Sequence, residues 1–382
     1  MSKKHLIKST GVISAGTAIS RILGFVRDIV IANFFGTSFT AQAFFVAFRI
    51  PNSLRDLVGE GAMNSAIVPV LSEYKAKGED KEFLHASRVL FNISLASLSV
   101  LTLLGIIFSP LVVRVIAPGF IRDPATLNIT IQLNRIIFPY LILIGLTAYT
   151  MGVLNTLRRF AIPAFGPCLL NIALIGAAIW LCPRIGVVGL VIGVLIGGVL
   201  QLSLNMAAMY KNKVTINLKD GLKHPAVKRI GLLMIPRAFG SAIYQVNIFV
   251  DTILASLSWI VGEGGVAALY YANRLIQFPL AIFGLAIAQA ALPKMSQEFS
   301  SNDLTKLKGT LSFALRTTFL IMLPASVGLC MLGVPIIKLL FQRGEFTAYS
   351  TDITQSALFF YTFGLCAYSG VKLLVTCFYS MQ

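Results

Sequence analysis

The chain has 382 residues, of which 56% are hydrophobic and 12% are charged, and its mean hydropathy is +0.81. This composition excludes an ordinary soluble domain, in which about a quarter of the residues are charged. The net charge of +17 fits either a nucleic-acid-binding protein or a membrane protein, and the positions of the basic residues distinguish the two.

Apolar stretches long enough to cross a bilayer, about 20 residues each, recur along the whole chain. They predict an all-α polytopic membrane protein with about ten transmembrane helices. The predicted spans are residues 10–34, 39–70, 88–116, 129–156, 162–182, 185–210, 229–257, 264–293, 311–340 and 352–380. The basic stretch 1–8 leads into the first span without a small-residue cleavage site, which favours a retained helix over a signal peptide.

The basic residues follow the predicted membrane topology. If the N-terminus is cytoplasmic, the cytoplasmic segments hold 18 of the 32 lysines and arginines, and the external loops hold five. This asymmetry is the positive-inside rule. It accounts for most of the charge without a nucleic-acid partner, and it predicts contact with the anionic headgroups of membrane lipids.

The first span carries two arginines and an acid. Arg21 and Arg27 lie six residues apart, about 120° around a helix, so both can line one cavity, and Asp28 can pair with Arg27. An arginine at bilayer depth stays charged and costs about 2.5 kcal/mol or more, which favours a water-filled cavity or an anionic partner. The alternative is an arginine that snorkels to the lipid headgroups.

The second span repeats the six-residue spacing in Arg49 and Arg55. Pro51 can break the helix between them, Asn52 follows it, and Glu60 lies between two glycines. This pattern predicts a hinge or a substrate loop. A simple proline kink with Arg55 at the membrane surface is the alternative.

The later spans contribute Arg237, Asp251, Arg274 and Lys372. Asp251 is an isolated acid in an apolar helix, and such a carboxylate is protonated, paired or bound to a cation. It is therefore a candidate for binding a coupling ion, against the alternative of a structural pair with an arginine.

The sequence predicts no catalytic arrangement. The three histidines, His5, His85 and His224, lie in separate polar segments, the five cysteines lack metal-site or redox spacing, and there is no Walker motif. We expect no enzyme, no metal site and no cofactor. Transport would then draw on a Na⁺ or H⁺ gradient or on the membrane potential.

An internal repeat predicts two lobes. Residues 43–74 resemble residues 268–299, with Arg49 matching Arg274. The match joins the second span to the eighth, so the lobes would be parallel six-helix repeats. The expected parts are an N-lobe at 1–210, a cytoplasmic linker at 211–228 and a partial C-lobe at 229–382. Because the C-lobe has only four predicted spans, we expect it to be truncated.

Several stretches resemble one family of membrane transporters. They are SRILGFVRD (20–28), AFFVAFRIPNSLR (43–55), GEGAMNSAIVPVLSEY (59–74), LNTLRRFAIPAFGPCLLN (154–171), YYANRLIQFP (270–279), FQRGEFT (341–347) and VKLLVTCFYS (371–380). On these residues the chain resembles the MurJ (MviN) family of lipid II flippases, within the multidrug/oligosaccharidyl-lipid/polysaccharide (MOP) exporter superfamily. The resemblance implies a MATE-like fold of fourteen helices around a V-shaped cationic cavity, of which helices eleven to fourteen would be absent here.

The resemblance also implies roles for single residues. The cations of the cavity, which would bind the lipid II pyrophosphate through bidentate hydrogen bonds, would be Arg21, Arg27, Arg49, Arg55, Arg274 and Lys372. Supporting or gating roles would fall to Asp28, Pro51, Asn52 and Glu60. Asp251 matches a position that helps to bind sodium in some relatives. Some relatives have acids where this chain has Gln42, Asn273 and Gln277, so gating pairs that need those acids are not expected.

The expected function is movement of the undecaprenyl-pyrophosphate-linked peptidoglycan precursor from the cytoplasmic to the outer leaflet by alternating access. The expected location is the bacterial inner membrane, and the expected partners are lipid II, membrane lipids and the cell-wall synthesis machinery. The alternatives are a drug or polysaccharide-precursor exporter of the same superfamily and a non-transporting scaffold for cell-wall synthesis.

Overall fold

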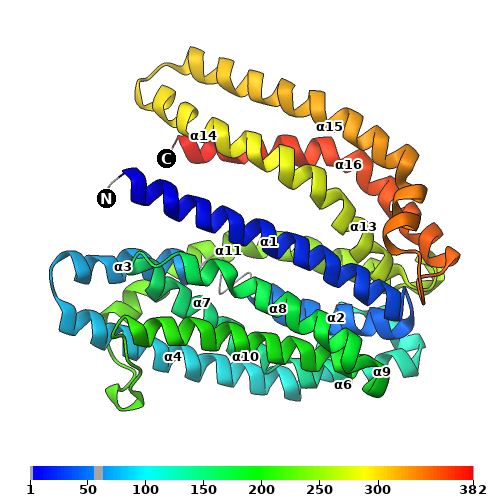
Figure 1. Ribbon diagram of the computed structural model, residues 1–382, viewed down its shortest axis with the longest axis horizontal. Coiled ribbons are helices and arrows are strands. Elements are labelled where there is room, and N and C mark those ends of the chain that lie inside the picture. The colour runs from blue at the N-terminus through cyan, green and yellow to red at the C-terminus, as the bar shows by residue number, and fades with distance from the viewer. Residues whose placement is uncertain (1–2, 56–62, 382) are drawn as a thin grey trace. The chain divides into compact units, whose positions relative to one another are not determined.

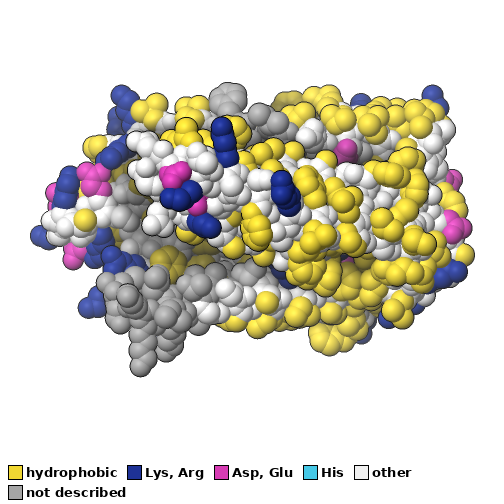
Figure 2. Space-filling view, turned by 90° about the horizontal axis from the view of Figure 1, so that it is seen from above, with side chains coloured by type: hydrophobic (Ala, Val, Ile, Leu, Met, Phe, Trp, Pro, Cys, Tyr) yellow, Lys and Arg dark blue, Asp and Glu magenta, His cyan; other side chains and the backbone are white. Residues whose placement is uncertain are grey.

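The computed structural model describes residues 3–55 and 63–381, and every regular element in these residues is a helix (Figure 1). The prediction of an all-α fold is therefore confirmed. Hydrophobic side chains cover much of the right half of the face in Figure 2, whereas charged side chains lie at its ends and also within its left half.

Long helices occupy the predicted spans in order. Their bounds are α1 Lys3–Phe35, α2 Phe39–Arg55, α3 Asn64–Ala76, α4 Asp80–Ile107, α5 Ser109–Ile116, α6 Pro124–Ile137, α7 Tyr140–Thr156, α8 Ala161–Trp180, α10 Val188–Lys211, α11 Pro225–Ser256, α13 Gly265–Pro279, α14 Leu285–Ser300, α15 Leu304–Phe341 and α16 Ala348–Ser380. Short turns of helix connect some of them: η2 Pro118–Arg122, α9 Cys182–Ile185, η3 Leu218–Asp220, α12 Ser258–Val261 and η4 Leu280–Gly284.

Seven stretches of helix among the described residues are long and apolar enough to cross a membrane. The helices α1, α2 and α11 fall outside this set, and α2 has only 17 residues. The count of ten spans therefore stays a prediction, although each predicted span contains a helix. Several membrane-crossing helices in one chain make it a multi-pass membrane protein.

The eighth predicted span is an interrupted helix, because one turn of π-helix, η4, lies between α13 and α14. The described part of the second predicted span consists of α2 and α3. The π-turn begins directly after Pro279, which lacks the backbone N–H that a regular helix requires. Pro51 does not end a helix, contrary to the expected break, because α2 continues through it to Arg55.

Two compact units divide the chain, Met1–Glu263 and Gly264–Gln382. The described helices of the second and eighth predicted spans pack on corresponding partners, each within its own unit. In the first unit α2 packs on α6 and α3 on α7, and in the second both α13 and α14 pack on α16. This agreement supports the internal repeat. The helix α11 belongs to the first unit by its packing, while the lobe boundary at 211–228 stays a prediction.

Segments of the first unit that were predicted to share one side of the membrane contact one another. On the predicted cytoplasmic side, Arg159 Nε donates to Asn212 Oδ1 at 3.2 Å. At the same end Arg229 pairs with Glu73. Hydrogen bonds from Lys77 and Arg229 lower the pKa of the Glu73 carboxyl below its ordinary value, because they stabilise its charged form.

On the predicted external side, η2 is joined to the end of α11. The backbone N–H of Gly119 donates to Ser256 Oγ at 3.0 Å, and the Arg122 guanidinium lies 3.8 Å from the centre of the Trp259 ring. Both contacts connect segments that are far apart in sequence. They hold the end of α11 against the first unit.

We expect Gly119→Ala to destabilise the protein. A Cβ atom at this glycine would lie 1.8 Å from the Ser256 carbonyl oxygen, so the backbones of η2 and α11 would have to separate. Overpacking of this kind costs about 1–3 kcal/mol. The measurement is the temperature at which the detergent-solubilised protein loses its monodisperse peak. Gly231→Ala is the control, because nothing lies within 4 Å of a Cβ there, and equal melting of both variants would contradict the prediction.

Candidate functional site

Arg27 and Asp28 form a buried pair on α1. Arg27 Nη2 lies 2.7 Å and Nε lies 2.9 Å from Asp28 Oδ1, and the two side chains are 11% and 0% exposed. The pair formed by these neighbours was predicted from the sequence. Because the Asp28 side chain is fully buried, Arg27 supplies the hydrogen bonds and the opposite charge that a buried carboxylate requires.

Asn171 of α8 extends this pair into a network between two helices. Its Oδ1 accepts a hydrogen bond from Arg27 Nη1 at 3.1 Å, and its Nδ2 donates to the Ser20 carbonyl at 3.0 Å. The helices α1 and α8 pack along each other. Asn171 was not predicted as a site residue, since nothing in the sequence around it indicates a contact with a residue far away in the chain. Arg27 is therefore partly a structural residue, which fixes α1 on α8.

Arg21 differs from Arg27 in its surroundings. It is exposed on α1, and it forms no hydrogen bond or ion pair with any residue that the structure describes. Six residues separate the two arginines, which places Arg21 about 9 Å from Arg27 along the helix axis. Arg21 thus keeps its hydrogen-bond donors available for a ligand.

Arg49 connects α2 to α11. Its Nη1 donates to Thr252 Oγ1 at 2.5 Å, and its positive charge attracts the exposed carboxylate of the neighbouring Asp251. Among the described residues no group of three or more His, Cys, Asp or Glu side chains could hold a metal ion, so the coupling-ion role stays a prediction.

The second unit carries its own pair of cations on packed helices. Arg274 is half-buried on α13, and Lys372 is half-buried on α16 with its Nζ 5.3 Å from the centre of the Tyr368 ring. These two helices pack together. Next to Arg274, Gln277 Nε2 donates to Asn273 Oδ1 at 2.6 Å, so these two amides interact where some relatives were expected to have acids.

The remaining predicted residues have different outcomes. Pro51 is buried and Asn52 half-buried on α2. Glu60 lies outside the described residues, and of Arg55 only the helical backbone is described. The predicted cations lie on α1, α2, α13 and α16, and one cavity lined by them stays a prediction.

Comparison with known proteins shows the family of the chain. A family model described as "Lipid II flippase MurJ" matches residues 31–382. The chain is 38% identical to a probable lipid II flippase MurJ of Vibrio cholerae over 99% of its own length and 73% of the relative. It is 36% identical to the lipid II flippase MurJ of Burkholderia cenocepacia, with 99% and 74% covered.

The chain belongs to the lipid II flippase MurJ family. A solved structure titled as lipid II flippase MurJ in an inward closed conformation matches it with a TM-score of 0.83 and 30% identity, over 97% of this chain and 76% of that one. A MATE transporter of the MOP superfamily matches with a TM-score of 0.69 and 18% identity, over 95% and 84%, which shows a shared fold. The resemblance inferred from the sequence is thus confirmed for family and fold.

We expect Arg27→Ala to lower stability strongly, because it leaves the Asp28 carboxylate buried without its guanidinium. Removing one partner of a buried pair costs about 3 kcal/mol or more. The double variant Arg27→Ala with Asp28→Asn should recover much of this loss. The measurement is the melting temperature of each variant in detergent, and Arg21→Ala is the matched control on the same helix. Equal melting of Arg27→Ala and Arg21→Ala would show that the pair does not stabilise the fold.

Proposed function

We propose that the protein moves lipid II from the cytoplasmic to the outer leaflet of the bacterial inner membrane by alternating access through a cationic cavity. The observation that carries this proposal is the similarity to curated lipid II flippases over 99% of the chain. The cations on α1, α2, α13 and α16 support it, because an anionic headgroup requires such groups as hydrogen-bond donors.

The chemistry of the ligand fits guanidinium groups. Lipid II carries a pyrophosphate, and arginine offers paired N–H donors that match phosphate oxygens and remain charged at any physiological pH. Arg21 is the residue of the first unit best placed to make this contact, since it is exposed and has no partner among the described residues. Arg27 and Arg49 would act mainly as positioning residues through Asp28 and Thr252.

Alternating access requires that the headgroup bind differently in the two states of the cavity. The energy would come from a Na⁺ or H⁺ gradient or from the membrane potential, with Asp251 as the candidate for the coupling ion. A cytoplasmic N-terminus is the orientation that the positive-inside rule favours. The contacts among predicted cytoplasmic segments support a common side for them.

The test is complementation of a bacterium depleted of its own lipid II flippase, scored as lipid II exposed on the outer leaflet. We expect the unaltered chain to restore exposure and Arg21→Ala to reduce it by about tenfold, the worth of one charge-assisted hydrogen bond to phosphate. Arg184→Ala is the matched control, because Arg184 is also exposed but lies in a predicted external loop. Protein abundance should be the same in all three strains.

Two results would contradict the proposal. If the unaltered chain is stably inserted but exposes no lipid II, it is not a flippase by itself, and an exporter of another substrate or a scaffold takes its place. If Arg21→Ala restores exposure as well as the unaltered chain does, headgroup binding does not depend on this cation.

A further inference from the structure

The loop of residues 212–224 between α10 and α11, called here the α10–α11 loop, is fixed on the side of α4. Asn92 Nδ2 donates to the carbonyl oxygens of Asn217, Leu218 and Gly221 at 3.2, 3.4 and 3.1 Å. One amide group thus gathers three backbone carbonyls. The path of the loop is therefore set by Asn92, a buried side chain of a helix that is long and apolar enough to cross the membrane.

Arg88, one turn earlier on α4, holds the same loop. It donates to the Thr215 carbonyl at 3.1 Å and to Thr215 Oγ1 at 2.6 Å. Its Nη1 lies 3.3 Å from Asp220 Oδ2. These contacts use the guanidinium for the internal structure of the loop.

The point of attachment lies at the depth where α4 enters the bilayer. The segment Asp80–Arg88 is rich in charged residues, and from Val89 onward α4 carries no charge. At 1.5 Å per residue, Asn92 lies about 18 Å along the helix from Asp80. The α10–α11 loop is therefore drawn down to the level of the lipid headgroups.

Apolar side chains of this loop divide into two sets. Val214 is buried and Ile216 packs against the core of the first unit, whereas Leu218 and Leu222 are 66% and 54% exposed. Exposure of these two leucines to water is unfavourable, because their apolar surface stays hydrated. At headgroup depth they can enter the boundary of the acyl chains, as the apolar residues of interfacial segments do.

Basic side chains surround the two leucines. They are exposed, and none of them forms an ion pair with an acid that the structure describes; they are Lys213, Lys219, Lys223 and Lys228. The neighbouring acids are already engaged, since Asp220 pairs with Arg88 and Glu73 with Arg229. The positive charge of the lysines is thus left for a partner outside the protein.

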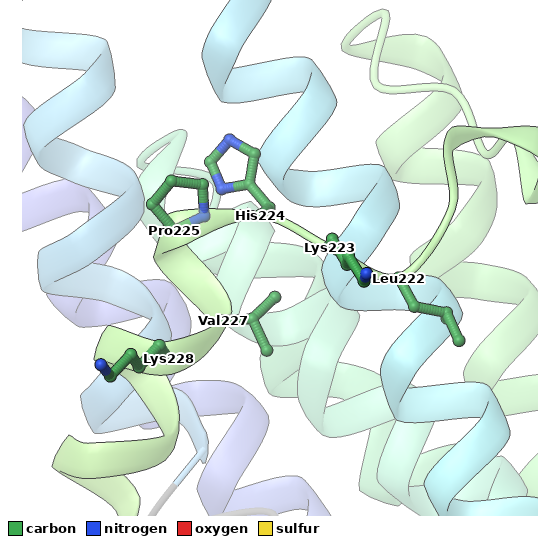
Figure 3. Close-up of a pocket in the computed structure, with 6 residues that line it drawn as sticks. All are labelled: Leu222, Lys223, His224, Pro225, Val227 and Lys228. Atoms are coloured by element: carbon green, nitrogen blue, oxygen red, sulfur yellow. The ribbon is translucent and has the colours of Figure 1, made fainter.

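A shallow hollow lies beside these residues (Figure 3). It has a volume of about 460 Å³, and its lining combines basic and apolar side chains: Leu222, Lys223, His224, Pro225, Val227 and Lys228. Lys223 and Lys228 are carried by the loop and by the first turn of α11, respectively (Figure 3). An anionic headgroup with its apolar chain fits this mixture of lining groups.

We propose that the α10–α11 loop is a membrane-surface anchor, in which Leu218 and Leu222 enter the headgroup region and the four lysines bind the phosphates of anionic lipids. The depth of the loop and the exposed leucines favour a membrane over a soluble partner. Clustered lysines beside a membrane helix are the usual recognition of anionic lipid surfaces. The anchor would hold the start of α11 at a fixed depth, and it does not depend on which lipid the protein transports.

The test is tryptophan fluorescence of the whole chain reconstituted in vesicles. The two native tryptophans are replaced by Trp180→Phe and Trp259→Phe, and Leu222→Trp introduces a single probe. The vesicles contain phosphatidylcholine alone or equimolar phosphatidylglycerol, with brominated acyl chains as quenchers. Ala76→Trp is the matched control. Ala76 is exposed, and it is the last residue of α3, just before α4 begins at Asp80 on the predicted cytoplasmic side.

We expect brominated lipids to quench the probe at position 222, and brominated phosphatidylglycerol to quench it more strongly than brominated phosphatidylcholine. The preference for phosphatidylglycerol should disappear when the four lysines are changed to glutamine. The probe at position 76 should stay unquenched. Quenching at 222 no stronger than at 76 would overturn the proposal and would indicate a loop that faces water, free for a soluble partner. Equal quenching in both lipids, or a preference that survives Lys→Gln, would overturn the anionic-lipid contact. None of these readouts requires transport, so they are independent of the proposed function.

Discussion

A guanidinium at bilayer depth stays ionised, and the fold of this chain depends on giving such groups partners. Arg27 meets Asp28 and, through Asn171, ties α1 to α8. Arg49 meets Thr252 and ties α2 to α11. In each case an arginine donates a hydrogen bond to a side chain of another helix, so that the contact also joins the two helices. In a lipid environment, where apolar side chains gain little by leaving lipid for protein, polar contacts of this kind carry much of the specificity of helix packing.

The same constraint separates cations that support the structure from cations that can bind a ligand. Arg27 and Arg49 use their N–H groups within the first unit, whereas Arg21 is exposed and without a partner among the described residues. The predicted cytoplasmic end shows the same division. There, Arg88 and Arg229 are engaged with Asp220 and Glu73, while the four lysines in and beside the α10–α11 loop are exposed. Residues whose hydrogen-bond donors are not engaged within the described protein can thus bind two kinds of anionic partner. These are a pyrophosphate inside the membrane and lipid phosphates at its surface.

Much of the fold could be predicted from the sequence, because apolar length and charge position are local properties. All ten predicted spans contain a helix, and the pairing of Arg27 with Asp28 follows from their adjacency. The contacts of Arg27 with Asn171 and of Arg49 with Thr252 could not be predicted, because they join residues separated by 144 and 203 positions. The path of α2 through Pro51 also differs from the expected break. A proline inside a membrane helix is tolerated where neighbours satisfy the freed backbone group, and the sequence does not show those neighbours.

The central claim is that exposed arginine recognises the pyrophosphate of a polyprenyl lipid. The most direct measurement is native mass spectrometry of the detergent-solubilised chain with lipid II and with undecaprenyl monophosphate, for the unaltered protein, Arg21→Ala and Arg184→Ala. The account predicts tighter binding of lipid II than of the monophosphate by the unaltered protein and by Arg184→Ala, with most of this preference lost in Arg21→Ala. Equal binding of lipid II by all three proteins, or no preference for the pyrophosphate, would contradict it.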